Sequence, residues 1–541
     1  MVRGICVFTP TSLRHNAHIP FASGIIERPR LLEKLQGALD HKLTLISAPP
    51  GYGKTTLAAQ FARESPFLAA WHAVEERERD VPNLHSQAVT ALSYIAPGIE
   101  TLVPSPGYTA AELASLVTNY LRDNVSETIL YVIDDVHQLS GSNAAETWLR
   151  TFTALIPPNC HLILISRALP DLPLTEMIAR REVLAIGQDQ LRFTADEVRR
   201  LADKLEVMPS QDQVHALASS LEGWPAGTVL ALQPLPVELE RFMLQGGQGP
   251  EALFDSLAAV TLDAQPPGLR DFLLGSSTLT RLTPELCSMA LGLPDSADWL
   301  NEAINRNLFI SKVSGGLVYH RLFRDFLQQT LYALDSARYV GLHCRAAQWF
   351  EAHNRIDDAF EHYVAAGLTD EAAAIAEHNS RTYFAQGKVE TLLGWVSRLK
   401  RVGVQPPHLL YTAAMIHTDR YEYELAEEEL ALAEESFLMR RDAVGSAEVQ
   451  VQRSMINVQR GRYAEAVAQA GHLATDQSYA SSVRGRALKV LGFARLHLGQ
   501  VGMATRDLEE AVALFRSNGD AYSLAGLLQD LEVAYIRSGR L

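Results

Sequence analysis

Four short, predominantly apolar runs stand out in the first third of the chain, at residues 43–46, 67–71, 129–133 and 161–165. They lack the regular alternation of apolar and polar positions that a half-exposed strand shows. Strands that are apolar on both faces are typical of a parallel sheet covered by helices on both sides. Helix-like runs separate the four strands, so the pattern predicts a doubly wound α/β domain over residues 25–190.

Helical patterns replace the strand pattern after residue 190. Thr194, with Glu197 three positions later, is the signature of a capping box at a helix start. Residues 191–235 are therefore expected to form a small helical lid, and the Pro-, Gly- and Gln-rich residues 234–250 to form a linker or loop.

Residues 236–335 combine helical runs, one of them over residues 279–291, with a hairpin turned at Gly315 and Gly316. Three helices and such a hairpin resemble a winged helix. No basic recognition helix is present in it, so it is not expected to read DNA.

Residues 336–541 are helical throughout, with short turns at Gly461, Gly499 and Gly539 that recur about every 40 residues. This spacing predicts a solenoid of helical pairs that resembles tetratricopeptide arrays. The chain stops directly after the last of these turns, without a polar capping helix. We therefore expect a fragment, a short member of its class, or part of an assembly.

Composition narrows the function classes. The chain has 541 residues and a net charge of −15, which argues against a general nucleic-acid surface. Four scattered cysteines lack metal-like spacing and indicate a reducing compartment. No run is long and apolar enough for a membrane span, and residues 1–24 look like a loosely structured arm without a signal-peptide block. We expect a cytoplasmic protein, in which the charged run at residues 75–80 is a solvated loop.

A glycine-rich turn between the first strand and the next helix carries the chemistry. Its residues are Pro50, Gly51, Tyr52, Gly53, Lys54, Thr55 and Thr56. Strand, glycine-rich turn and helix form the context of a P-loop, in which backbone N–H groups and the helix N-terminus bind phosphates. Lys54 is expected to reach the β- and γ-phosphates of ATP, and the Thr55 hydroxyl to bind Mg²⁺. The first glycine of the usual pattern is replaced by Ala48.

Two further strands end in charged residues. Asp134 and Asp135 follow the strand at residues 129–133, as in a Walker B motif. We expect Asp134 to hold Mg²⁺, directly or through water, and Asp135 to orient or deprotonate the attacking water; the alternative is a solvated strand end. Arg167 follows the strand at residues 161–165 and is placed to sense a γ-phosphate, unless it is a surface arginine paired with a carboxylate.

In their order along the chain, several segments resemble the MalT-like regulators, which belong to the signal-transducing ATPases with numerous domains (STAND). The matching segments are residues 27–32, 50–56, 70–71, 132–137, 165–170, 191–194, 222–224 and 319–323. The resemblance implies that ADP holds a closed monomer. It also implies that ATP, with an inducer on the helical repeat, drives opening and self-association, and that slow hydrolysis resets the switch. Residues near Ile25 and Arg28 would line the adenine side, and His320 would reach the phosphates unless it is a packing histidine.

The resemblance has one gap, since no helix-turn-helix occurs in the sequence. DNA binding is therefore expected only through a missing or separate segment. A catalytic P-loop enzyme, such as a kinase or a nucleic-acid-stimulated ATPase, is the alternative. It would need an acceptor pocket or a basic channel, and the acidic composition and the long helical repeat favour neither. A repeat scaffold with a vestigial ATP site is a third interpretation.

Overall fold

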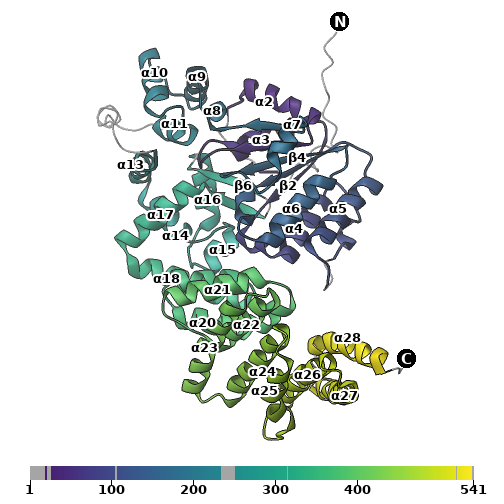
Figure 1. The fold of residues 1–541 in the computed structure, drawn as a ribbon. Coiled ribbons are helices and arrows are strands. Elements are labelled where there is room, and N and C mark those ends of the chain that lie inside the picture. The colour runs from purple at the N-terminus through teal and green to yellow at the C-terminus, as the bar shows by residue number, and fades with distance from the viewer. Residues whose placement is uncertain are drawn as a thin grey trace. The chain divides into compact units, whose positions relative to one another are not determined.

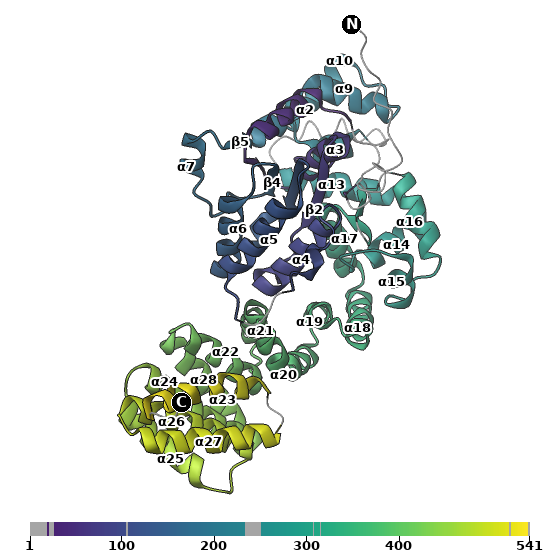
Figure 2. The same cartoon turned by 90° about the vertical axis from the view of Figure 1, so that its right-hand side faces the viewer.

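The computed structural model describes residues 19–20, 26–103, 107–232, 250–306, 308–313, 315–518 and 521–538 (Figures 1 and 2). Residues 234–249 of the predicted linker, most of the predicted arm and the Gly539 turn lie outside these ranges. The chain divides into two compact units, Met1–Gly367 and Leu368–Leu541.

A five-stranded parallel sheet forms the centre of the first unit. Its strands are β1 (Leu43–Ser47), β2 (Leu68–Ala73), β3 (Ile129–Asp134), β4 (Cys160–Ser166) and β5 (Val183–Ile186), in the order β2-β3-β4-β1-β5. All strand pairs in it are parallel. The four predicted strands are confirmed. The edge strand β5 escaped prediction because it is short and its first three residues are not fully buried.

Helices cover both faces of this sheet. They are α2 (Pro29–Gln36), α3 (Lys54–Glu64), α4 (Val81–Ser93), α5 (Ala110–Asn124), α6 (Asn143–Leu155), α7 (Leu174–Ala179) and α8 (Gln188–Leu191), with short 3-10 turns η1 (Gly37–Asp40), η2 (Glu76–Arg79), η3 (Ile99–Thr101) and η4 (Val136–Leu139). Figure 1 shows α2 and α3 on one side of the sheet and α4, α5 and α6 on the other. Side chains of α4, α5 and α6 form one buried core with alternate residues of the strands, such as Tyr131 and Leu164. The predicted α/β class is thus confirmed.

The charged run at residues 75–80 is not the solvated loop that its composition suggests. It forms η2, and Glu78 in it is 1% exposed. The Glu78 carboxylate lies 2.6 Å from Nε2 of His72 on β2, and Nδ1 of the same ring lies 2.9 Å from the Tyr131 hydroxyl on β3. The His72 ring, whose other nitrogen contacts Tyr131, supplies a buried partner for the carboxylate, and this allows a charged run to turn inward.

The lid and the winged helix complete the first unit. Lid helices are α9 (Ala195–Lys204), α10 (Gln211–Ser220) and α11 (Pro225–Ala231); the following elements are α13 (Pro250–Asp263), α14 (Pro267–Ser276), α15 (Pro284–Met289), α16 (Ser296–Asn305), β6 (Ile310–Val313), β7 (Gly316–Tyr319), α17 (Arg321–Leu334), α18 (Ser336–Ala352) and α19 (Ile356–Ala365). The capping box of Thr194 and Glu197 is formed. The helix expected over residues 279–291 is shorter, because Leu282 pairs with Leu317 in a β-bridge and Pro284 starts α15.

The second unit is an array of antiparallel helices. They are α20 (Thr369–Ala385), α21 (Val389–Arg401), α22 (Pro407–Asp419), α23 (Tyr423–Arg440), α24 (Ala443–Gln459), α25 (Tyr463–Thr475), α26 (Ser481–His497), α27 (Val501–Asn518) and α28 (Ala521–Ser538). Gly461 and Gly499 end helices with φ of 76° and 75°, and Tyr421 takes the same left-handed conformation one repeat earlier. No helix in the described ranges of the chain has the length and hydropathy of a membrane span.

Candidate nucleotide site

The P-loop follows β1, between the flanking strands β4 and β5. Gly51 and Gly53 have φ of 79° and 74°, a conformation that favours glycine, and α3 begins at Lys54. Ala48 is buried and does not take a positive φ, so alanine fits where glycine is usual. The Lys54 ammonium donates to the Pro49 carbonyl at 2.9 Å. Burial, aided by the charge of Arg167, lowers the pKa of Lys54 to about 8.

Asp134 and Asp135 lie at the carboxyl end of β3, beside the P-loop helix. Asp134 is 5% exposed, and its side chain forms a hydrogen bond with Thr55. Burial and the neighbouring charge of Asp135 raise the pKa of Asp134 to about 7. The Asp135 N–H donates to Asp134 Oδ1 at 2.9 Å, and Asp135 itself has a φ of 57°. A non-glycine residue rarely takes this left-handed conformation.

A hydroxyl and a buried carboxylate in hydrogen-bond contact are an oxygen donor set that suits Mg²⁺, which keeps several water ligands and takes one or two from the protein. A divalent cation would also favour the ionised form of Asp134. Thr55 and Asp134 therefore fit the metal that the motif predicts.

Arg167 and His320 approach the same place from other elements. Arg167 Nη2 lies 4.0 Å from Asp135 Oδ1. His320 precedes α17 of the winged helix, and its ring contacts those of Phe254 and Phe309. Burial, aided by the nearby charges of Lys54 and Arg167, lowers the pKa of His320 to about 4. Within the described ranges, Nδ1 of His320 is buried without a hydrogen-bond partner.

The lid contacts the P-loop directly. The Trp224 indole donates from Nε1 to the Pro50 carbonyl at 3.2 Å, and the Ala226 N–H donates to the Gly51 carbonyl at 3.0 Å. A Cβ at Gly51 would lie 2.7 Å from Trp224 Nε1, so the indole needs a glycine there. Trp224 was not among the site residues expected from the sequence. The signal was the segment Gly223-Trp224-Pro225, in which Trp224 directly precedes the proline that starts helix α11.

Comparisons with known proteins match this arrangement. The family model of the MalT winged helix domain matches residues 258–339. The HTH-type transcriptional regulator MalT of Yersinia enterocolitica is 27% identical over 537 residues, which cover 94% of this chain and 58% of the regulator. In sequence the chain is similar to MalT, and in fold it is similar to a STAND protein.

Two further relatives fit this MalT-like assignment. The serine/threonine-protein kinase PknK of Mycobacterium tuberculosis is 30% identical over 414 residues, which cover 72% of this chain and 36% of the kinase. A crystal structure of a STAND protein with a tetratricopeptide repeat sensor from Pyrococcus horikoshii superimposes with a TM-score of 0.50 at 15% identity, covering 96% of this chain and 81% of that one. The latter likeness supports the fold. The chain spans 36% and 58% of the lengths of the two curated relatives.

Arg28 of this MalT-like chain joins the sheet domain to the lid. Its guanidinium donates to the carbonyls of Leu191 and Arg192 at 2.8 and 3.0 Å and pairs with the Glu197 carboxylate at 3.1 Å. Nε and Nη2 are thereby occupied by the protein. The described contacts of Arg28 are thus with the lid, while its expected role beside adenine stays a prediction. Ile25, expected nearby, lies outside the described residues.

Proposed function

We propose that this chain is the ATP/ADP-dependent switch of a cytoplasmic, MalT-like transcriptional regulator. In this proposal ADP stabilises a closed state. ATP, together with an inducer on the helical repeat, opens it and drives self-association. DNA binding belongs to a separate helix-turn-helix segment.

The unpartnered His320 carries the proposal. Burying a polar nitrogen without a hydrogen bond costs free energy, about 1–3 kcal/mol. The ring belongs to the winged helix, yet its pKa is lowered by the charges of Lys54 in the P-loop and of Arg167, which follows β4. An anionic phosphate between these groups would supply the missing partner of His320 and offset the two cations. Phosphate occupancy would then favour the contact between the winged helix and the P-loop.

Hydrolysis in this proposal needs few residues. Lys54 and Arg167 stabilise charge on the phosphates, and Asp135 orients the attacking water. Thr55 and Asp134 hold Mg²⁺, which neutralises charge on the phosphate oxygens. Pro50, Gly51, Tyr52, Gly53 and Thr56 complete the loop that surrounds the phosphates. Slow turnover suits a reset.

A switch also has to supply enough differential binding. Moving a two-state equilibrium from 1:99 to 99:1 requires about 5.5 kcal/mol of preference for one state. ATP differs from ADP by one phosphoryl group, and the contacts of that group supply part of the required preference. We assign the remainder to the inducer and to self-association.

The first test identifies the nucleotide that the purified protein retains. The protein is prepared without added nucleotide and denatured, and the released compounds are separated by chromatography. Stoichiometric ADP is expected, and Lys54→Ala should lose it, whereas Lys34→Ala on α2 should keep it. An empty site with rapid ATP turnover would contradict the switch and indicate an enzyme that turns over ATP. ADP retained by Lys54→Ala would refute the P-loop assignment.

The second test addresses the closed state. His320→Ala is expected to release ADP faster and to shift the protein towards larger assemblies when ATP is added, as measured by light scattering. His353→Ala serves as the matched control, because the described contacts of that ring are a hydrogen bond to the Trp349 carbonyl of α18 and stacking on the Trp349 ring. An unchanged rate of ADP release in His320→Ala would show that His320 does not stabilise the closed state.

A further inference from the structure

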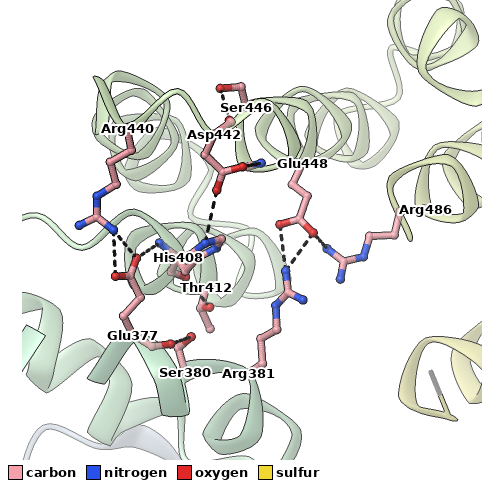
Figure 3. A network of polar contacts seen from close by, with 11 residues as sticks. Glu377, Ser380, Arg381, His408, Thr412, Arg440, Asp442, Ser446, Glu448 and Arg486 are labelled. Carbon is pink, nitrogen blue, oxygen red and sulfur yellow. Dashed lines mark hydrogen bonds and ion pairs between the residues drawn. The ribbon is translucent and has the colours of Figure 1, made fainter. Parts of the chain in front are cut away.

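Polar groups in the helical repeat illustrate how a buried charge is satisfied in this chain. Glu448 of α24 is 1% exposed and accepts from Arg381 of α20 at 2.9 Å and from Arg486 of α26 at 3.2 Å (Figure 3). Glu377 of α20 accepts the His408 N–H at 2.9 Å, at the start of α22. These contacts join neighbouring helices, so the network has a structural role.

His137, in the first unit, is not satisfied in this way. It lies in η4, directly after β3, and its side chain is 17% exposed. Within the described ranges, Nδ1 of its ring is buried and forms no hydrogen bond. This nitrogen lies 3.7 Å from Asp135 Oδ1, which is longer than a hydrogen bond. A buried nitrogen without a partner calls for an explanation.

The turn after β3 brings His137 beside Asp135. Asp135 has a φ of 57°, and its carbonyl accepts the Gln138 N–H at 2.9 Å, so the chain turns back at this point. Val136 and Leu139 are both buried in the core between the sheet and its helices. The backbone that carries His137 is therefore anchored by its neighbours, which suits a residue that holds another side chain in place.

Two groups from different elements approach the same oxygen of Asp135. His137 Nδ1 lies 3.7 Å from Asp135 Oδ1, and Arg167 Nη2 lies 4.0 Å from it. Catalytic hydrogen bonds are often long before the substrate binds and tighten in the reacting complex. In the proposed function Arg167 contacts the phosphates of ATP. His137 is then the group that stays with Asp135.

The electrostatics of His137 suit a group that orients a carboxylate. Burial lowers the pKa of His137, the charge of Asp135 opposes this shift, and the charges of Arg167 and Lys54 add to it. The ring is therefore neutral at neutral pH and carries one N–H group. A neutral donor can orient Asp135 without adding a further positive charge beside Lys54 and Arg167.

We propose that His137 is a positioning residue, which donates from Nδ1 to Asp135 and holds that carboxylate towards the water that attacks ATP. The proposal rests on the proposed function, in which Asp135 orients this water. During hydrolysis the water oxygen bonds to the γ-phosphorus while the bond from this phosphorus to the β,γ-bridging oxygen breaks. The bridging oxygen keeps the electron pair and leaves with ADP, and the proton of the water passes to Asp135. His137 keeps its own proton throughout.

The test compares the rate of single-turnover ATP hydrolysis with the affinity for ATP in the full chain. General-base catalysis contributes about a hundredfold or more, and without His137 the carboxylate is present but less often oriented, so His137→Ala should slow hydrolysis about tenfold. Its equilibrium affinity for ATP should stay within about threefold of the unchanged protein's. His137→Asn keeps an N–H donor close to the position of Nδ1, and it should restore most of the rate.

A double-mutant cycle separates positioning from a direct contact with the phosphates. If His137 acts through Asp135, His137→Ala should slow hydrolysis no further once Asp135→Asn is present. The matched control is His161→Ala. His161 lies near the amino end of β4, away from the carboxyl ends of the strands, and its Nδ1 contacts the His41 carbonyl at 3.1 Å. This variant should hydrolyse ATP at the unchanged rate.

Four results would overturn the proposal. They are an unchanged rate in His137→Ala, a loss of ATP affinity as large as the loss of rate, a His137→Asn variant as slow as His137→Ala, and a further tenfold loss in the double variant. Failure of the proposed function looks different, because the unchanged protein would then bind ATP without hydrolysing it. That result would contradict reset by hydrolysis and the positioning role together, whereas hydrolysis that is insensitive to His137 would remove the positioning role alone.

Discussion

Glu197 is the carboxylate on which the contact between α2 and the lid depends. It is fully buried and pairs with Arg28 at 3.1 Å and with Arg30 at 2.9 Å. It also accepts the Thr194 N–H in the capping box. Glu197→Gln keeps the shape of the side chain, and the amide oxygen can still accept this N–H. The substitution therefore removes chiefly the negative charge, and leaves two guanidiniums side by side.

The expected free-energy cost of Glu197→Gln follows from the burial of its partners. Removing one partner of a buried ion pair costs about 3–5 kcal/mol, because the other charge stays desolvated. Arg28 is 5% exposed but keeps its hydrogen bonds to the Leu191 and Arg192 carbonyls, which places the cost near the lower end, about 3 kcal/mol. The Arg30 side chain is 38% exposed, so Arg30→Gln should cost less than about 1 kcal/mol.

Hydrogen exchange of α9 measures this difference locally, in a protein whose several parts do not unfold in one step. With ADP bound, Glu197→Gln should accelerate exchange of α9 amides by about a hundredfold. Arg30→Gln should change it only a few-fold, and amides of α5 should not change in either variant. Equal effects of the two substitutions, or none in Glu197→Gln, would refute the argument from burial.

Three further predictions concern residues of the first unit, Met1–Gly367. Asp135→Asn should slow single-turnover ATP hydrolysis about a hundredfold and leave equilibrium ATP affinity within about threefold, since the role assigned to it is general-base chemistry; equal losses would make its role structural. Gly51→Ala should lower the melting temperature with ADP more than Gly53→Ala, because only the Gly51 Cβ meets the lid indole. Burial lowers the pKa of His343 and His362, so as pH falls below about 6.5 the unfolded chain binds more protons and the folded state loses about 1.4 kcal/mol per pH unit for each proton. Melting at several pH values should show this slope, and His362→Gln should reduce it.

The elements that the sequence predicted well are those whose signals are local. The strand at β3 is continuously apolar up to Asp134, and the capping box of Thr194 and Glu197 needs only residues three positions apart. Gly461 and Gly499 mark helix ends because few other residues take a positive φ. Periodicity and turn chemistry carry this information without any knowledge of tertiary contacts.

Tertiary contacts decide the remainder. The run at residues 75–80 looks solvated in the sequence, because the sequence does not show that His72 on β2, in contact with Tyr131 on β3, pairs with the Glu78 carboxylate. Arg28 and Glu197 are separated by 169 positions, and no pattern along the chain pairs them. The P-loop and its acidic strand end were predictable from motif and context, whereas the indole above Pro50 depends on how the lid packs.

The lid contacts explain why nucleotide occupancy and lid position can act on each other. The Pro50 carbonyl and the Gly51 N–H are two ends of one planar peptide, as are the Gly51 carbonyl and the Tyr52 N–H. The lid holds the carbonyl ends of both peptides, through Trp224 and Ala226. In a P-loop the N–H ends face the phosphates. A phosphate that orients the N–H groups therefore orients the carbonyls that the lid recognises, and reciprocity requires the lid to affect phosphate affinity by the same factor.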